Sequence, residues 1–119
     1  MITLKQIEEA QQRIYKMARK TSLKHSSSLS KITGYDVFLK PECLQKTGSF
    51  KIRGAANKIL TLSAEEGACG VVTGSSGNHG QAVACAAALA GFPATVIMPE
   101  GGSQAKAESI RGYGAELLF

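Results

Sequence analysis

The sequence predicts an α/β fold in which helices connect the strands of a parallel sheet. Three observations support this fold class. Short apolar runs at 70–73, 94–98 and 115–119 are typical of buried strands, helical patterns fill 78–90 and 103–111 between them, and the connecting loops are short. Consecutive parallel strands need a crossover, usually a helix, so this alternation favours a parallel sheet with right-handed crossovers.

The alanine-rich segment 78–90 is expected to pack closely against its neighbours, and Gly91 is expected to end it. The first half of the chain is predicted to be mainly helical. Its elements in order are a helix over 3–20 with Thr3 as N-cap, an extended stretch over 21–28, a short helix from 26 or 27 to Gly34, a strand over 36–40, a helix over 49–62 with Ser49 as N-cap, and a turn or short helix at 64–67.

Length and composition exclude several classes of function. A chain of 119 residues with 44% apolar content can form a core, and nothing in it indicates disorder. Fourteen basic and nine acidic residues give a mild net charge of +5, there is no Trp, and the basic residues form no long run, so a nucleic-acid partner is not predicted. The basic face of the first helix is read as solvated and not as membrane-binding.

Cysteine usage and hydropathy favour a cytoplasmic location. The three cysteines lack close pairing such as C-x-x-C, so neither a disulfide framework nor a metal site is predicted. The sequence has no run of eighteen apolar residues and no apolar core of a signal peptide.

Lys51 is the first candidate functional residue. It lies between Phe50 and Ile52, at the expected start of a helix. Apolar neighbours would disfavour its charged form, lower its pKa and free a nucleophile able to form a Schiff base. The alternative is a solvated lysine whose stem lies over Phe50, and the residue pattern taken by itself favours that alternative.

The loop from Gly74 to Gly80 is the second candidate. It follows a predicted strand and opens a helix, at the strand end where parallel sheets bind ligands. Its backbone N–H groups, followed by a helix N-terminus, could hold a carboxylate or a phosphate. A loop whose glycines only permit a tight turn is the alternative, but that reading does not explain Asn78 and His79.

Two other chemistries are open for the same loop. A dinucleotide-binding domain would place glycines after a strand, with Glu100 about twenty residues on as a ribose-binding acid. The spacing is nevertheless G-x-x-G-x-x-G and not G-x-G-x-x-G. A nucleophilic Ser75 or Ser76 with His79 as base is a weaker alternative, since the loop is not a G-x-S-x-G elbow and no acid partner is evident.

Two motifs resemble one family. Residues 40–55, KPECLQKTGSFKIRGA, and residues 75–81, SSGNHGQ, are similar to the lysine segment and the substrate loop of fold-type II pyridoxal-phosphate enzymes, in the branch of threonine dehydratases and serine racemases. The likeness runs from about 21 to 119 and implies the tryptophan synthase beta-like fold. Complete members are much longer, so we expect an incomplete chain, with 1–65 in the large cofactor domain and 66–119 in the small substrate-loop domain.

The resemblance also implies roles for individual residues. Lys51 matches the lysine that forms a Schiff base with pyridoxal 5'-phosphate and removes the α-proton of the substrate. Phe50 matches the residue packed against the cofactor ring, and Asn78 matches the side chain that bonds its phenolic oxygen. The loop matched to the substrate carboxylate consists of Ser75, Ser76, Gly77, Asn78 and His79.

The implied activity is β-elimination of L-threonine or L-serine to a 2-oxo acid and ammonia. Serine racemase is the alternative within the branch, because Ser76 matches the acid/base on the opposite face of the cofactor in racemases. The resemblance implies an amino-acid substrate and a homo-oligomer for a full-length enzyme. We expect this chain by itself to be inactive and to expose apolar surface on the strands of Val71, Ile97 and Leu117.

Overall fold

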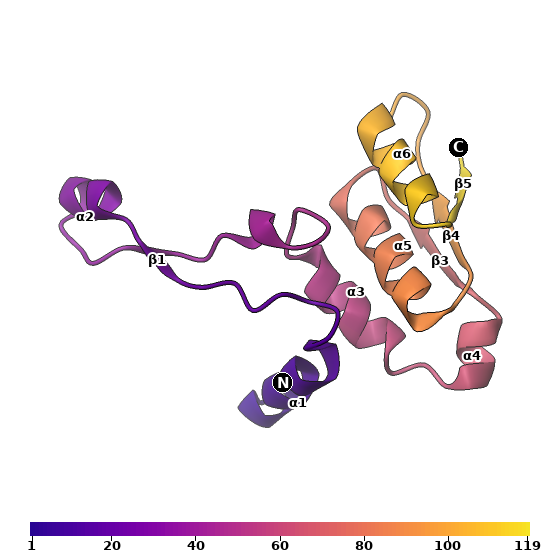
Figure 1. Cartoon of the computed structure of the whole chain (residues 1–119), viewed down its shortest axis with the longest axis horizontal. Coiled ribbons are helices and arrows are strands. Elements are labelled where there is room, and N and C mark those ends of the chain that lie inside the picture. The colour runs from indigo at the N-terminus through magenta and orange to yellow at the C-terminus, as the bar shows by residue number, and fades with distance from the viewer.

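Two sheets and seven helical segments make up the computed structural model, which describes residues 1–119 (Figure 1). The elements in chain order are α1 (Leu4–Ile14), β1 (Lys24–His25), α2 (Ser27–Thr33), β2 (Phe38–Leu39), the 3-10 helix η1 (Glu42–Leu44), α3 (Lys51–Ile59), α4 (Ala64–Ala68), β3 (Val71–Gly74), α5 (Asn78–Ala90), β4 (Ala94–Ile97), α6 (Gln104–Gly112) and β5 (Glu116–Leu118). None of the helices is both long and apolar enough to cross a membrane.

The C-terminal half forms the predicted parallel sheet, with strand order β3-β4-β5. Val71 pairs with Ala94 and Gly74 with Ile97, while Val96 pairs with Leu117. Helices α5 and α6 are the crossovers between consecutive strands. The fold class predicted from the alternation of apolar runs and helical patterns is therefore confirmed.

Helix α5 is the centre of the core. Its residues from Gly80 to Ala87 are all buried, between α3 and the sheet. Small side chains allow this close approach: a Cβ added at Gly80 would lie 2.8 Å from Cγ1 of Val96. Gly91 ends the helix in the left-handed conformation. The expected close packing and the expected end of this segment are both confirmed.

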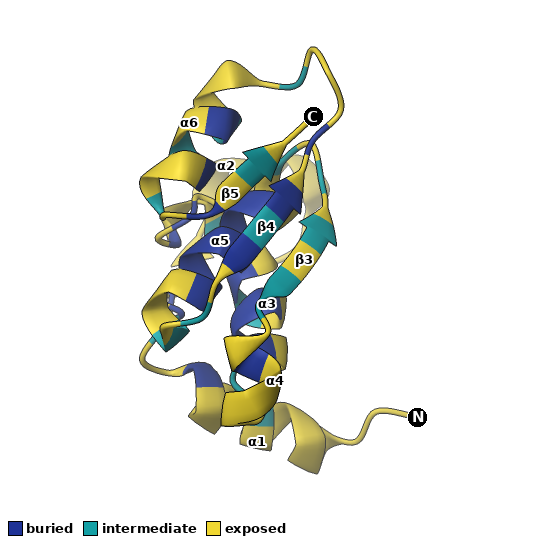
Figure 2. Cartoon of the chain, turned by 90° about the vertical axis from the view of Figure 1, so that its right-hand side faces the viewer, coloured by how far each residue is buried: buried dark blue, intermediate teal, exposed yellow.

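The opposite face of the sheet is open. Figure 2 shows the three strands in front of α5, with no helix over the face turned to the viewer. Val72, Ile97 and Leu118 are exposed on these strands. Since parallel sheets are normally covered on both faces, this surface is unusual for an isolated unit. Exposed apolar surface was expected here, although Val71 and Leu117 themselves are half-buried.

An arm made of β1, α2 and β2 extends from the body of the chain (Figure 1). The two strands pair antiparallel, with Lys24 opposite Leu39. Its side chains Leu23, Ile32 and Tyr35 are exposed. The radius of gyration is 16.5 Å, against about 13.5 Å for a compact domain of this length, so the arm makes the molecule elongated.

Local signals correctly predicted several helix boundaries. Thr3 caps α1 through a capping box with Gln6, and Ser26 caps α2. Gly34 ends α2 in the left-handed conformation. These boundaries depend only on neighbouring residues, which is why they can be read from the sequence.

Several predicted boundaries are wrong. The helix predicted over 49–62 ends at Ile59, with Leu60 as its C-cap. The first helix ends at Ile14 and not at 20; Tyr15 is its C-cap, and at Arg19 the backbone N–H and C=O bond the Gln45 side chain instead of helical partners. The strand predicted over 36–40 contains only Phe38 and Leu39, since its partner β1 has two residues. Ser49 does not cap α3, whose N-cap is Phe50, without a side-chain hydrogen bond.

Candidate active site

Lys51 is the first residue of α3 and its side chain is exposed. Its Nζ lies 5.1 Å from the centroid of the Phe50 ring, and Phe50 is 58% exposed. Successive helical residues point in directions about 100° apart, so the fully buried Ile52 enters the core while Lys51 faces solvent. The predicted apolar surroundings of Lys51 are therefore wrong, and the alternative, a lysine lying over Phe50, describes this structure.

The loop before α5 presents unused hydrogen-bond donors. The Ser75 N–H bonds the carbonyl of Ile97, and the Gly77 N–H donates to Oγ of Ser75. No side chain caps α5, and no intrachain acceptor is found for four backbone N–H groups at its start. These are the N–H groups of Ser76, Asn78, His79 and Gly80.

The side chains of this loop are also free. Ser76, Asn78 and His79 are exposed, and their side chains make no hydrogen bond within the chain. Four N–H donors and an amide side chain at a helix N-terminus suit a small anion such as a carboxylate. No hydrogen bond joins His79 to either serine, as a serine nucleophile would need.

Packing brings α3 and α5 side by side, as Figure 1 shows. A cavity of ≈ 330 Å³ lies between α3, β3 and the start of α5, and His79 lines it together with Gly54 and Ala55. Gly54 follows Lys51 by one helical turn. The lysine segment and the glycine loop, which are more than twenty residues apart in sequence, thus form neighbouring parts of one region.

Sequence reasoning missed two hydroxyl groups in the loop before Lys51. Oγ1 of Thr47 and Oγ of Ser49 are buried and have no hydrogen-bond partner. Buried polar groups usually have a partner, so unpaired hydroxyls are uncommon in a folded chain. The only sequence signal was the small polar run 47–49, of which Ser49 was interpreted as a helix cap.

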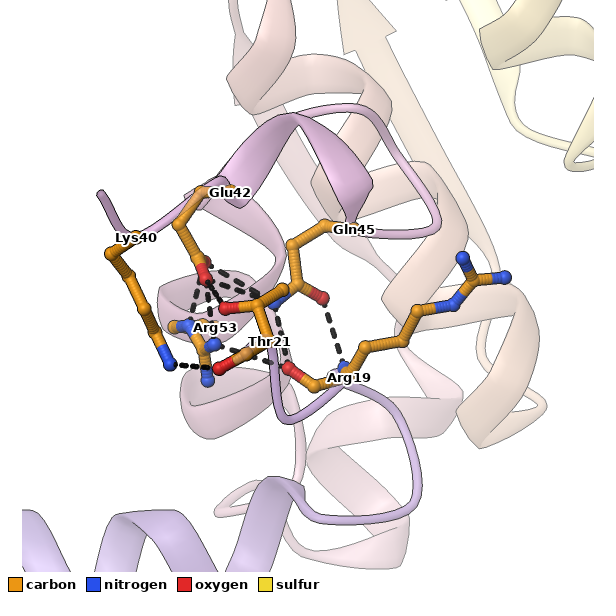
Figure 3. Close-up of polar contacts among 6 residues, drawn as sticks. All are labelled: Arg19, Thr21, Lys40, Glu42, Gln45 and Arg53. Atoms are coloured by element: carbon orange, nitrogen blue, oxygen red, sulfur yellow. Dashed lines mark hydrogen bonds and ion pairs between the residues drawn. The ribbon is translucent and has the colours of Figure 1, made fainter. Parts of the chain in front are cut away.

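A polar cluster beside α3 was also missed. We call it the Glu42 cluster; Figure 3 shows its members, which are Arg19, Thr21, Lys40, Glu42, Gln45 and Arg53. Arg53 donates from Nε to Oε2 of Glu42 at 2.7 Å and from Nη2 to Oε1 at 2.8 Å. Thr21 donates to the same carboxylate at 2.6 Å, and Gln45 donates to it at 3.2 Å. The bond from Arg53 is the main cause that lowers the pKa of Glu42 to about 2.

The Glu42 cluster predicts acid-sensitive stability. The carboxyl pKa falls from 4.5 to about 2 on folding, so its stabilisation is complete above pH 4.5 and is lost as the pH falls towards 2. Since the Arg53 side chain is 33% exposed and partly screened, we expect roughly 2 kcal/mol at neutral pH. Urea unfolding of the wild type and Glu42→Gln from pH 7 to pH 2 measures this contribution. The difference in unfolding free energy between the two proteins should shrink towards zero as the pH falls below 4.5. A constant difference would contradict the assignment.

These features define an α/β unit with a parallel sheet, an exposed amine at the start of α3 and free N–H donors at the start of α5. Comparison with known proteins goes further. The family described as "Pyridoxal-phosphate dependent enzyme" matches residues 14–119. The chain belongs to this family, in the branch of threonine ammonia-lyases and serine racemases.

Individual relatives support the same placement. The chain is 51% identical over 119 residues to the L-threonine ammonia-lyase of Thermotoga maritima, covering all of this chain and 30% of the relative. It is 44% identical over 113 residues to the serine racemase of Arabidopsis thaliana, covering 95% and 34%. The chain thus spans about a third of the length of these relatives.

A solved structure agrees on the fold. The crystal structure of serine racemase from Dictyostelium discoideum superposes with a TM-score of 0.93 at 45% identity, covering 98% of this chain and 38% of that one. The chain therefore has part of the tryptophan synthase beta-like fold, as the sequence motifs implied.

The residues present fit the cofactor that the family name implies. Lys51 offers an exposed amine with no ion-pair partner, and the unprotonated form of this amine can condense with an aldehyde. The free N–H groups before α5 and the unpaired Asn78 side chain offer donors for oxygen atoms. No group of three or more His, Cys, Asp or Glu side chains is arranged to hold a metal ion.

Proposed function

We propose that this chain is part of a pyridoxal-phosphate enzyme that deaminates L-threonine or L-serine to a 2-oxo acid and ammonia. One observation carries the proposal: α3, which begins with the unpaired amine of Lys51, packs against α5, whose start offers four free N–H donors. An amine and an anion site together can hold an aldehyde cofactor and an amino acid. The similarity to a threonine ammonia-lyase supports this choice of substrate.

The proposed roles follow from what each group offers. Pyridoxal phosphate, when bound, supplies an aldehyde for amines and a ring that delocalises the electron pair left by the α-proton. Lys51 would hold the cofactor through Nζ, then take the α-proton once a substrate amine has replaced it. Phe50 would cover one face of the ring, and the Asn78 side chain would donate to the phenolic oxygen of the cofactor.

The substrate carboxylate is assigned to the loop before α5. The N–H groups of Ser76, His79 and Gly80 have no other acceptor, and a helix N-terminus favours an anion by roughly 0.3–1 kcal/mol. Ser75 is assigned a supporting role, since its Oγ accepts from the Gly77 N–H and so shapes the loop. A carboxylate bound there would fix the orientation of the α-carbon relative to Lys51.

A serine racemase is the second candidate. The exposed Ser76 hydroxyl, which has no hydrogen-bond partner, supports it. Racemisation needs a proton donor on the face opposite the base, and elimination does not. Serine racemases of 44–46% identity support this alternative to a similar degree.

Several properties of a complete enzyme remain predictions. They are the division into cofactor and substrate-loop domains at residue 65, an amino-acid substrate, a homo-oligomeric assembly and a cytoplasmic location. We also expect that the 119-residue chain binds the cofactor weakly and turns over no substrate. The phosphate-binding loop of the family is not among the motifs identified in this sequence.

The test uses the purified chain with pyridoxal phosphate, borohydride reduction and peptide mapping. We expect the reduced adduct mainly on Lys51, and we expect added L-threonine or L-serine to decrease it by competing for the aldehyde. Assays for 2-oxo acid and for D-serine in the same samples would separate elimination from racemisation if turnover occurs. Label spread evenly over the exposed lysines would refute the assignment of Lys51.

A further inference from the structure

The start of α3 lacks the side-chain N-cap that α1, α2 and α4 have. Thr3, Ser26 and Ser63 each cap a helix by accepting a bond from a backbone N–H group. Phe50 at the N-cap of α3 makes no such bond, and the Ser49 hydroxyl is buried without a partner. Contacts from elsewhere in the chain are therefore the side-chain bonds that can fix the turn that carries Lys51.

The Glu42 cluster supplies these contacts. Arg53, in the first turn of α3, bonds Glu42 through two nearly parallel N–H groups, a geometry that fixes orientation as well as distance. Its Nη2 also donates to the carbonyl of Arg19 at 3.1 Å. Figure 3 shows the guanidinium of Arg53 held between the Glu42 carboxylate and the Arg19 segment.

Further bonds hold Glu42 itself in place. The buried Gln45 accepts from the Arg19 N–H at 2.9 Å and donates to the Arg19 carbonyl at 2.8 Å. Lys40 donates to the carbonyl of Thr21 at 2.6 Å. Two segments distant in sequence, 19–21 and 40–45, thus form one frame to which Arg53 is attached.

Helix geometry connects this frame to Lys51. Residues two apart on a helix point in directions about 200° apart, so Arg53 and Lys51 lie on nearly opposite sides of α3. Ile52, between them, is fully buried in the core. Anchors at Arg53 and Ile52 therefore define the rotation of the first turn while Lys51 stays free.

We propose that Glu42 and Arg53 are positioning residues for Lys51: their two-bond pair sets the position and rotation of the first turn of α3, and so the place where the Lys51 amine meets an aldehyde. This inference rests on the proposed role of Lys51. Neither residue contacts the cofactor or the substrate in the proposal, because both act through the helix backbone.

The test compares adduct formation at Lys51 and Lys16 in the full chain. Lys16 is a matched internal reference, since it is exposed and its Nζ lies 5.7 Å from the Tyr15 ring centroid. The amine condenses with the aldehyde of pyridoxal phosphate with loss of water, and borohydride supplies the hydride that makes the bond permanent. The measured quantity is the ratio of initial labelling rates, well below the unfolding midpoint of each variant.

We expect Glu42→Gln and Arg53→Lys each to lower the Lys51/Lys16 ratio about tenfold, as small misplacements of reacting groups can do. Arg53→Lys keeps the charge but loses the two-bond geometry. The ratio of the double variant should be no lower than that of either single variant, because both changes remove the same interaction.

Acetic anhydride is a control reagent that needs only an exposed amine. With it, the Lys51/Lys16 ratio of each variant should stay within about twofold of the wild-type ratio. Glu116→Gln, which removes a carboxylate bonded to Thr95 on the sheet, is the control and should change neither ratio.

Amide hydrogen exchange provides a readout that needs no cofactor. In Glu42→Gln, the N–H groups of Arg53, Ala55 and Ala56 should exchange about tenfold faster, while those of α5 keep their protection. An unchanged pyridoxal ratio, unchanged exchange in α3, or faster exchange in all helices alike would each overturn the inference. Failure of the proposed function looks different: the wild type would then show no preference for Lys51, and the exchange pattern alone would decide whether Glu42 fixes this turn.

Discussion

Replacing Lys51 by alanine is expected to remove at least about nine-tenths of the preferred pyridoxal label from the chain, the largest chemical effect of any single substitution. Lys51 is the only residue in the first turn of α3 with an amine that can bond an aldehyde carbon. The variant should remain folded. Lys51 is exposed and loses only its contact with the Phe50 ring, worth about 0.5–1 kcal/mol.

The matched control for this experiment is Lys16→Ala. Lys16 also lies over an aromatic ring and is also exposed, so its loss removes the same chemical group from a place outside the candidate site. Absorbance, borohydride labelling and peptide mapping of both variants check the prediction. Full labelling of Lys51→Ala, or equal losses in the two variants, would contradict a special role for Lys51.

The sequence predicts the parallel sheet because each of its signals is local or periodic. The apolar runs 70–73 and 94–98 have the length of buried strands. The alanine-rich helix between them has small side chains, which favour close packing against its neighbours. The path of the chain after α1 depends instead on a distant partner. The Arg19 N–H bonds the Gln45 side chain across 26 positions, and no spacing rule in the sequence indicates such a bond.

The same distinction applies to the candidate site. The glycine loop was predicted as a donor site because its place, after a strand and before a helix, determines what its backbone offers. The surroundings of Lys51 were predicted wrongly, since neighbours in sequence are not neighbours on a helix surface: Ile52 turns inward and Phe50 turns out to solvent. The pairing of Glu42 with Arg53 was not foreseen, because it joins η1 to α3 at no helical or strand spacing.

Ile52→Ala is expected to destabilise the chain by about 3 kcal/mol, the largest structural effect we predict. Ile52 is fully buried and is among the largest side chains that the core encloses completely. Its replacement by alanine would leave a cavity in a small core, since only 25 of 119 residues are buried. Urea unfolding followed by circular dichroism should show a lower midpoint, or no cooperative transition at 25 °C.

Ile32→Ala is the control for Ile52→Ala, since Ile32 is 79% exposed on α2 and should change stability by less than about 0.5 kcal/mol. Equal effects of the two substitutions would mean that α3 is not packed as described. The comparison also separates two ways of disturbing Lys51. Loss of Ile52 should unfold α3 and the core together, because Ile52 holds α3 to the core. Loss of the pair between Glu42 and Arg53 should move only the first turn of α3 and leave α5 intact, because Arg53 holds α3 to the segment 19–21.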